Sequence, residues 1–389
     1  MKIDRQALIF AVIILAIVGV VGGFVWFSAL FKTTGEGERS PIENFFSSLF
    51  PFGTTTRPGD GGGTGNGTGP EGPTPTLRQV TGKPTSGFTY REGNILRYIE
   101  RETGHVFETP FDSWKTTRIS NTTIPGAYAI AWLPPDSFVM QYFAPNGTTR
   151  NFLATLASST PDQTLLGRFL DQATEIYPSP KEGEMIRVRK GANGTVVDRV
   201  KTESGESETV FSSGLRSWQV IPSGTSLYVG TSPSSVDGFL FRVSGESLEK
   251  IVGSVRSLSS LPHTEGRYIA YSSGLALGVL DTEEDRFYPA QVNTFADKCS
   301  WFPAGRPLLF CGVPAEASAS LEAWHMGVQP LSDSAWVIDP MRGTATIVSH
   351  LDLDAGRAID VWKPVVSPDG SYAAFMDKND LSLWLLKLP

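Results

Sequence analysis

A tight turn followed by a half-buried strand recurs along this chain from about residue 80 onward. Its clearest copy is Val366–Phe375, in which Pro368, Asp369 and Gly370 form the turn and Tyr372–Phe375 forms the strand. Aspartate and glycine suit such a turn because both tolerate a left-handed backbone conformation, and proline fixes φ beside them. Strands joined by turns this short predict an all-β body.

The prolines at these turns indicate the length of the repeat. Taken as marks before the second strand of each unit, they are Pro84, Pro134, Pro180, Pro222, Pro262, Pro303 and Pro368. The first five intervals are 40 to 50 residues, close to what a four-stranded propeller blade needs. The last interval is 65 residues, and an insertion near 314–333 would account for the excess. The sequence therefore predicts a seven-bladed β-propeller, with six or eight blades as alternatives.

The seventh unit provides only three strands, the last of them over Leu381–Leu386. An unpaired sheet edge is a liability, and closing the ring removes it. The segment Thr76–Val80 directly precedes the first unit and can supply the missing fourth strand. We therefore expect Leu77 and Gln79 to lie in a strand that joins the beginning of the propeller domain, 77–389, to its end.

An uncharged run of 25 residues, 7–31, lies near the beginning of the chain. About 20 apolar residues cross a bilayer as a helix, so the run predicts a single-pass transmembrane anchor. A cleaved signal peptide is the alternative, but its apolar run is usually shorter and a small-residue cleavage motif should follow. Lys2 and Arg5 lie in the short tail 1–6. The positive-inside rule keeps this tail in the cytoplasm and places the body outside the cell membrane.

The segment 32–52 contains a short amphipathic pattern that begins at Ser40. Its apolar residues recur at helical spacing and are Ile42, Phe45, Phe46 and Leu49. Such a face suits a helix lying at the membrane surface; docking to a partner or to the body is the alternative. Residues 53–76 are rich in Gly, Thr and Pro and predict a flexible tether.

Cys299 and Cys311 flank the turn near Gly305 at equal distances along the chain. Residues opposite each other in an antiparallel pair lie about 4.5–5.5 Å apart between Cα atoms, which is within disulfide range. Such a pair should oxidise outside the cytoplasm. Two buried thiols that pack as small apolar groups are the alternative. We expect the disulfide.

The predicted insertion, Glu316–Asp333, contains Trp324, His325 and Met326 in succession. Insertions in repeat proteins map to loops on one face, often the binding face. A ligand or metal site is one interpretation. The interpretation we favour is that Trp324 and Met326 hold the loop against its blade. The loop is still the first candidate for contact with a partner.

Other functional classes lack a signal in the sequence. The formal net charge is −7 and no basic block is present, so nucleic-acid binding is not expected. The histidines show no metal-ligand spacing and are His105, His263, His325 and His350. We find no nucleophile elbow, zinc-protease motif or phosphate loop. The sequence therefore predicts no catalytic residue, metal or cofactor.

The turn Ser367–Gly370 and the strand Tyr372–Phe375, followed by Leu381–Leu386, resemble the repeats of TolB-like propellers and, more distantly, WD40 repeats. The combination of one anchor and a propeller also resembles envelope proteins of bacteria. The resemblance implies a propeller fold and protein–protein contacts in envelope assembly. It assigns no partner residue, because this motif is shared by propellers of unrelated function.

These observations favour a non-enzymatic scaffold that binds a protein partner in the cell envelope. The first alternative is a glycan-binding or glycan-cleaving enzyme with loop carboxylates at the propeller channel, which would require those carboxylates to converge with raised pKa values. A third possibility is a structural surface protein that self-associates through Gly19 and Gly23 or through the apolar helix.

Overall fold

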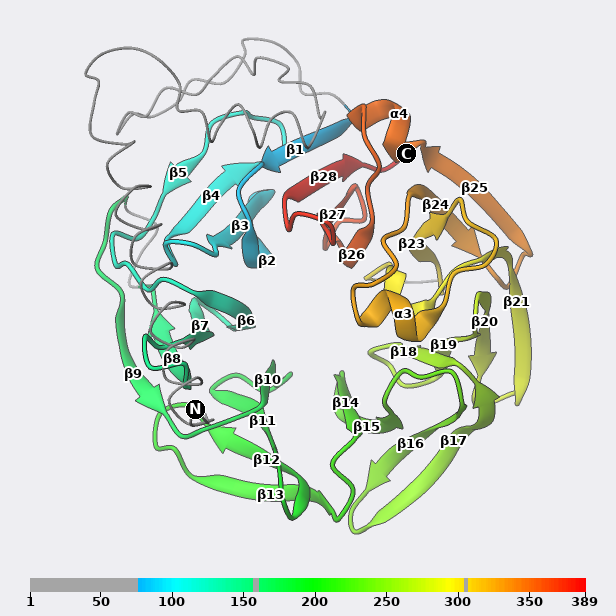
Figure 1. Ribbon diagram of the computed structural model, residues 1–389, viewed down its shortest axis with the longest axis horizontal. Helices are drawn as coiled ribbons and strands as arrows, with labels where there is room; N and C mark the ends of the chain where they lie inside the picture. Colours follow the sequence, from blue (N-terminus) through cyan, green and yellow to red (C-terminus); the bar gives the residue numbers. More distant parts are fainter. Residues whose placement is uncertain (1–75, 157–160, 304–306) are drawn as a thin grey trace, which may run out of the picture. The chain divides into compact units, whose positions relative to one another are not determined.

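The computed structural model describes residues 76–156, 161–303 and 307–389. These residues form seven four-stranded sheets, which are arranged as the blades of a ring (Figure 1). The fold is therefore the all-β, seven-bladed propeller that the proline spacing predicts. We number the blades in chain order, and in blades 1–6 the strands run from the inner to the outer edge of the ring.

The first four blades take up the first half of the ring. Blade 1 consists of β2 (Thr85–Arg91), β3 (Ile95–Glu100), β4 (Val106–Pro110) and β5 (Thr117–Arg118). Blade 2 consists of β6 (Ala127–Leu133), β7 (Ser137–Phe143), β8 (Thr149–Thr155) and β9 (Leu166–Leu170). Blade 3 consists of β10 (Glu175–Pro178), β11 (Glu184–Gly191), β12 (Gly194–Lys201) and β13 (Ser207–Ser213). Blade 4 consists of β14 (Trp218–Ser223), β15 (Ser226–Thr231), β16 (Asp237–Ser244) and β17 (Ser247–Arg256).

The remaining blades include three short helices in their connections. Blade 5 consists of β18 (Leu258–Pro262), β19 (Tyr268–Ser273), β20 (Ala276–Asp281) and β21 (Arg286–Asn293). Blade 6 consists of β22 (Cys299–Trp301), β23 (Leu309–Pro314), β24 (Asp333–Asp339) and β25 (Thr344–Ser349). Blade 7 consists of β26 (Val361–Val366), β27 (Tyr372–Asp377), β28 (Leu383–Lys387) and β1 (Leu77–Thr81). The helices are η1 (Ala296–Lys298), α3 (Leu321–His325) and α4 (Leu351–Ala355).

The turn between β26 and β27 shows why the repeat is visible in the sequence. Gly370 has a φ of 73°, and its N–H donates to the Ser367 carbonyl at 2.9 Å. The Asp369 carboxylate accepts hydrogen bonds from the hydroxyls of Ser367 and Ser371, each at 2.6 Å. Side chains that bond to their own turn are the physical basis of the Ser-Pro-Asp-Gly signal.

The ring closes as predicted, because β1 pairs antiparallel with β28. Leu77 lies opposite Leu386 and Gln79 lies opposite Trp384. Leu77 is buried in a core cluster that blades 6 and 7 share. Arg78 is buried as well and donates to the main-chain carbonyls of Pro110, which ends β4 of blade 1, and of Ser113, just after that strand. The strand therefore joins the two ends of the domain and links blade 7 to blade 1.

The prediction that Pro84 precedes the second strand of its blade was wrong. Pro84 lies between β1 and β2, so it precedes the first strand of blade 1 and not the second. The strand predicted after it is β2, the first strand of that blade. The interval from Pro84 to Pro134 therefore spans five strands, β2 to β6, and this explains its length of 50 residues.

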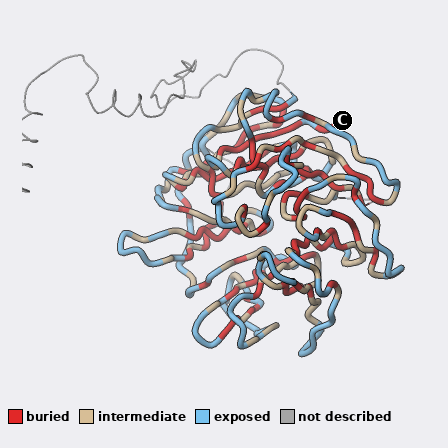
Figure 2. Tube along the Cα trace, turned by 45° about the vertical axis from the view of Figure 1, so that its right-hand side comes forward, coloured by how far each residue is buried: buried red, intermediate tan, exposed pale blue. Residues whose placement is uncertain are grey.

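Packing between blades supplies much of the core. The clusters of buried residues combine side chains from neighbouring blades, as at the boundary of blades 3 and 4, where Trp218 packs with Ile186 and Val197. Figure 2 shows this arrangement as buried stretches along the strands and exposed residues at many of the turns. Burial between blades explains why the inner strands carry apolar side chains toward their neighbours, whereas outer strands such as β9 are largely exposed.

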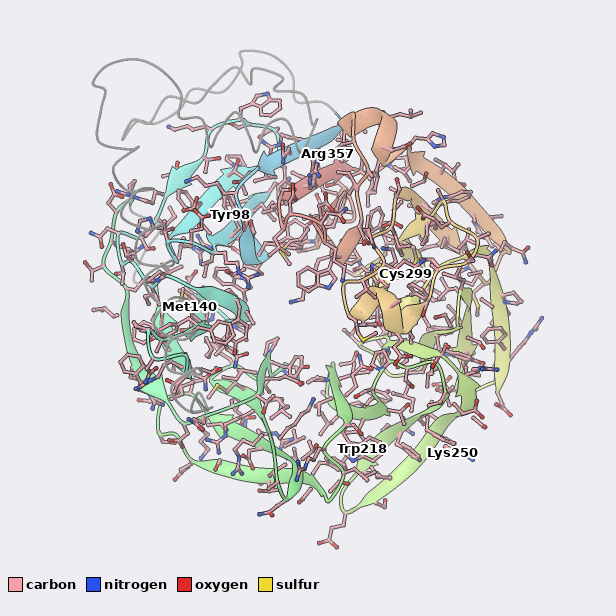
Figure 3. All side chains as sticks on the ribbon, viewed as in Figure 1. Tyr98, Met140, Trp218, Lys250, Cys299 and Arg357 are labelled. Carbon is pink, nitrogen blue, oxygen red and sulfur yellow. A yellow bond between two sulfur atoms is a disulfide. The ribbon has the colours of Figure 1, made fainter. Side chains whose placement is uncertain are left out.

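The predicted disulfide is present between Cys299 and Cys311. Cys299 opens β22 and lies directly opposite Cys311 of β23, and Figure 3 marks its position in blade 6. Both cysteines are buried. The equal spacing around the turn was therefore a correct guide to the register of this hairpin.

Removing the bridge with Cys299→Ala and Cys311→Ala should lower the free energy of unfolding by about 2–4 kcal/mol, since a short covalent loop restricts the unfolded chain. Guanidinium unfolding followed by tryptophan fluorescence measures the loss. Reduced wild-type protein is the matched control, and it should unfold at the same guanidinium concentration as the double variant. Equal stability of the oxidised protein and the double variant would show that the bridge contributes nothing.

Several predictions concern residues outside the described part of the chain. They are the cytoplasmic tail 1–6, the anchor 7–31, the segment 32–52 with Ile42, Phe45, Phe46 and Leu49, and the tether from residue 53 to 75. Within residues 76–156, 161–303 and 307–389, the helices are all too short or too polar to cross a membrane.

Candidate functional site: the inserted loop of blade 6

The insertion lies between β23 and β24, where the other blades have shorter loops, and it contains α3. Ser320 caps the helix by accepting a hydrogen bond from the Ala323 N–H at 3.3 Å. Leu321 and Trp324 of α3 are buried and pack with Phe295 and Leu331. So short a helix is not stable by itself, so its tertiary contacts hold it in place. Figure 1 shows α3 on the side of blade 6 that faces the middle of the ring.

The topology of a propeller explains which segments the insertion meets. Because the strands of a blade alternate in direction, the loop from second to third strand lies on the same face as the connection to the next blade. Lys298 ends the connection from blade 5 to blade 6, and Asp360 ends the connection from blade 6 to blade 7. Asp333 opens β24, directly after the insertion.

These three side chains form a buried ion cluster beneath α3. The Lys298 ammonium contacts Asp333 Oδ2 at 2.9 Å and Asp360 Oδ1 at 2.5 Å. The Trp324 indole N–H donates to both oxygens of Asp360, at 2.9 and 3.0 Å. The ammonium also lies 4.6 Å from the centroid of the Trp324 ring. Trp324 therefore fixes the insertion to the junction of blades 6 and 7.

The electrostatics of the cluster are those of two carboxylates that share one cation. Burial raises the pKa of the Asp333 carboxyl to about 6, and the nearby Lys298 charge opposes this shift. The Val361 N–H donates to Asp333 Oδ2 at 2.6 Å and stabilises the ionised form. Both Lys298 and Asp333 have no exposed side-chain surface. A raised pKa here is a consequence of burial, and a solvent-borne substrate has no access to either carboxylate.

Further contacts hold the insertion from three sides. The Lys378 ammonium, from the turn between β27 and β28, donates to the Trp324 carbonyl at 2.6 Å, and burial lowers the pKa of this lysine. His325 Nε2 lies 2.7 Å from Asp297 Oδ2 of η1. Glu322 accepts a hydrogen bond from the Ser235 N–H of blade 4 at 3.2 Å. The loop is therefore attached to segments of blades 4 and 7 as well as to its own blade.

Directly after α3, the insertion presents two apolar side chains to solvent. Met326 is 66% exposed and Val328 is 70% exposed. Trp324 holds the loop in place, as the favoured interpretation expected, but the same expectation for Met326 was wrong. Met326 follows α3, which buries Leu321 and Trp324 and leaves the next residue outside the packed surface. The three candidate residues, Trp324, His325 and Met326, thus divide into two that contact the fold and one that faces solvent.

No pattern in the sequence indicated that Lys298, Asp333 and Asp360 form a group. Each of them precedes or opens a strand and is separated from the others by most of a blade. Among the described residues, no group of three or more His, Cys, Asp or Glu side chains could hold a metal ion. Two carboxylates and a lysine are a charge-balancing arrangement and not a metal-binding one.

Comparisons with known proteins place this architecture among solved propellers. The Dos1 propeller is 10% identical, with a TM-score of 0.51, over 80% of this chain and 94% of that one. The β-propeller domain of the Trilobed protease from Pyrococcus furiosus is 12% identical, with a TM-score of 0.50, over 78% of this chain and 95% of that one. The shared feature is the fold. At sequence identities this low, the activity of a similar structure cannot be assigned to this chain.

Two more distant likenesses and two negative results complete the comparison. TolB from Acinetobacter baumannii is 9% identical, with a TM-score of 0.43, over 78% of this chain and 66% of that one. For the tricorn protease the identity is 10% and the TM-score 0.38, and the match spans 76% of this chain and 37% of that longer protein. No protein-family model matches the sequence. No curated protein matches it either.

Proposed function

We propose that this protein is a membrane-anchored scaffold outside the cytoplasm that binds a protein partner through the inserted loop of blade 6. The observation that carries the proposal is the pair of exposed apolar side chains, Met326 and Val328, in a loop that is otherwise tightly held. A preformed loop loses little conformational entropy on binding, so more of its contact energy is available as affinity. Methionine suits such a surface because its side chain adapts to varied partners.

The location outside the cytoplasm is part of the same proposal. Its supports are the uncharged run 7–31, with basic residues before it, and the Cys299–Cys311 disulfide. Disulfides persist in oxidising compartments and are rare in the cytoplasm. The resemblance of the last repeat to TolB-like propellers agrees with a role in envelope protein contacts.

A glycan-processing enzyme is the weaker alternative. It requires acidic side chains that reach solvent at an appropriate separation. Asp333 and Asp360, the carboxylates that converge beneath the insertion, are buried and neutralised in part by Lys298. The exposed feature of this face is apolar, which favours a protein ligand over a sugar.

In-cell crosslinking of the full-length protein, with mass spectrometry of the bound species, tests the proposed function. Met326→Asp with Val328→Asp should reduce capture of the dominant partner at least about tenfold, because a charge in an apolar contact is costly. Leu353→Asp is the matched control, since Leu353 of α4 is 74% exposed and lies outside the insertion; it should leave capture unchanged. Equal capture by all variants would exclude the loop, and absence of any partner would contradict the scaffold.

A further inference from the structure

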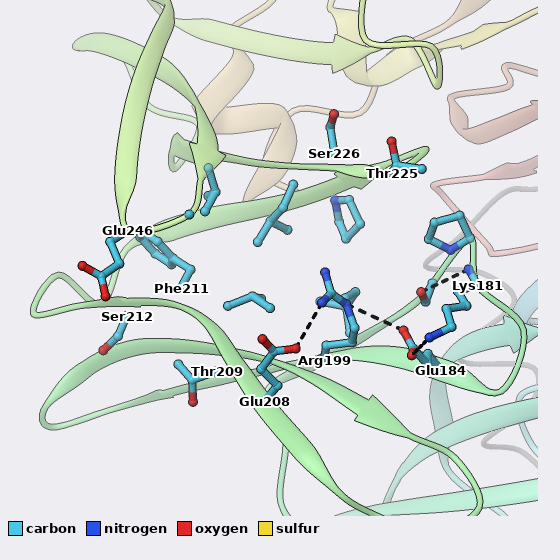
Figure 4. Close-up of a pocket in the computed structure, with 18 of the residues that line it drawn as sticks. Lys181, Glu184, Arg199, Glu208, Thr209, Phe211, Ser212, Thr225, Ser226 and Glu246 are labelled. Carbon is cyan, nitrogen blue, oxygen red and sulfur yellow. Dashed lines mark hydrogen bonds and ion pairs between the residues drawn. The ribbon is translucent and has the colours of Figure 1, made fainter.

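A groove separates blade 3 from blade 4 on the side of the ring away from the ends of the domain. Its volume is about 1230 Å³. One wall is formed by β13 and the neighbouring strands of blade 3, and the other by β15 and the turn between β16 and β17 (Figure 4). The two blades pack closely at Trp218 and diverge at the groove.

The groove follows an outer sheet edge. β13 is the last strand of its sheet and pairs with β12 on one side. Six consecutive residues, from Glu208 to Ser213, line the groove. The pairing with β12 shifts by one residue at Val210, between the pairs Val197–Phe211 and Asp198–Thr209. On either side of this bulge successive side chains point to opposite faces, so a run of six lining residues includes main-chain surface.

Thr209 shows that the main chain of β13 is exposed to the groove. Its hydroxyl donates to Asp198 Oδ1 at 2.9 Å. Asp198 is buried and ion-paired with Arg187 and Arg189, whereas the next residue, Arg199, lines the groove. The Thr209 side chain is therefore engaged on the face of the sheet opposite Arg199, and its contribution to the groove comes from the backbone.

The three cations that line the groove, Lys181, Arg199 and Lys201, are already paired with carboxylates. Arg199 lies 3.2 Å from Glu208 and 3.7 Å from Glu184. Lys181 lies 2.7 Å from Glu184, and Lys201 lies 2.7 Å from Glu206. No cation is left over to select a phosphate or a nucleic acid, so the charge balance favours a nearly neutral ligand.

Apolar side chains complete the groove on both walls. Phe211 of β13 faces a wall that contains Leu227, Val243 and Leu248 of blade 4. An extended peptide that adds to a sheet edge bonds through its main chain and places alternate side chains into such pockets. The six lining residues of β13 span roughly 20 Å, which suits a segment of about six residues.

We propose that this groove binds an extended, nearly neutral segment of a polypeptide partner, with alternating apolar side chains, as a fifth strand along β13. The inference deepens the proposed function, because it also assigns a protein ligand, but it uses a site on different blades from the inserted loop. Loss of one site therefore leaves the other intact.

The test uses the purified full-length protein and a library of nine-residue peptides with Val, Leu, Ile or Phe at alternate positions and Ser, Thr or Gln between them. Peptides selected from this library should bind and slow hydrogen exchange of β13 amides. A library of the same composition in helical order should yield no binder. Failure of the alternating library, or unchanged exchange in β13, would overturn the proposal.

A matched pair of variants locates the binding. Leu248→Glu should weaken binding of the selected peptides at least tenfold. Ile347→Glu should not, because Ile347 is equally exposed, at 40%, but lies on the outer strand of blade 6. Unchanged binding by Leu248→Glu would contradict the assignment. A dimer of the wild-type protein that Leu248→Glu dissociates would also contradict it, because a second copy of the chain would then occupy the groove. Met326→Asp should retain peptide binding, so the two proposals fail separately.

Discussion

Replacing Lys298 with methionine should destabilise the protein by about 3–5 kcal/mol, because it leaves two buried carboxylates without their cation. Methionine keeps most of the volume of the lysine stem, so the loss reports the charge and not a cavity. Asp333 and Asp360 both contact the ammonium directly. Guanidinium unfolding, monitored through tryptophan fluorescence, measures the change.

The pH dependence of this variant distinguishes charge from packing. The folded pKa of Asp333 is about 6 with Lys298 present, above its ordinary value of 3.8, and removing the ammonium should raise it further. A carboxyl with a raised folded pKa binds its proton more tightly in the folded state, so lowering the pH favours folding. The deficit relative to wild type should therefore narrow as the pH falls toward 6, and it should stay nearly constant below 6, where the folded carboxyl is protonated in both proteins.

Two comparisons control this experiment. Lys201→Met removes an exposed ion pair with Glu206 and should change stability little, because solvent screens such pairs. Adding Asp333→Asn and Asp360→Asn to Lys298→Met should recover part of the loss, and comparison of the single, double and triple variants apportions it. If Lys298→Met costs no more than Lys201→Met, the buried cluster does not stabilise the fold.

Deleting residues 77–80 should lower the melting temperature by about 10 °C or more. The deletion removes most of β1, so it unpairs the edge of β28 and exposes the core around Leu386. Loss of buried Leu77 alone is worth about 2–5 kcal/mol, and the lost strand pairing adds to it. In a domain of this size, each kcal/mol lost from the free energy of unfolding lowers the melting temperature by at most about 2–4 °C. Differential scanning calorimetry gives the shift.

Complementation provides the control for this deletion. A synthetic peptide of residues 76–81 should restore part of the melting temperature when added to the shortened protein, because it can occupy the vacated edge. A peptide with Leu77→Asp should restore less, since Leu77 is the residue that enters the core. A shortened protein that melts at the wild-type temperature would refute the closing role of β1.

The sequence by itself was sufficient for features that depend on local chemistry. Turns at Pro134, Pro222 and Pro368 mark blades because proline and the residues beside it restrict the backbone where they stand. The register of the Cys299–Cys311 hairpin followed from the equal spacing of the two cysteines about Gly305, and the extra length before Pro368 located the inserted loop. The position of Pro84 was misassigned because a proline turn between two blades has the same local features as a turn inside a blade, and only closure of the ring puts β1 and β2 in different blades.

Only the tertiary structure decided where the candidate sites lie. Lys298, Asp333 and Asp360 belong to different connections and meet because alternating strands bring successive connections to one face. The exposure of Met326 depends on how α3 packs, and the groove beside β13 depends on how far blades 3 and 4 diverge. These are properties of side-chain packing between segments distant in the chain, and such packing leaves no local pattern in the sequence.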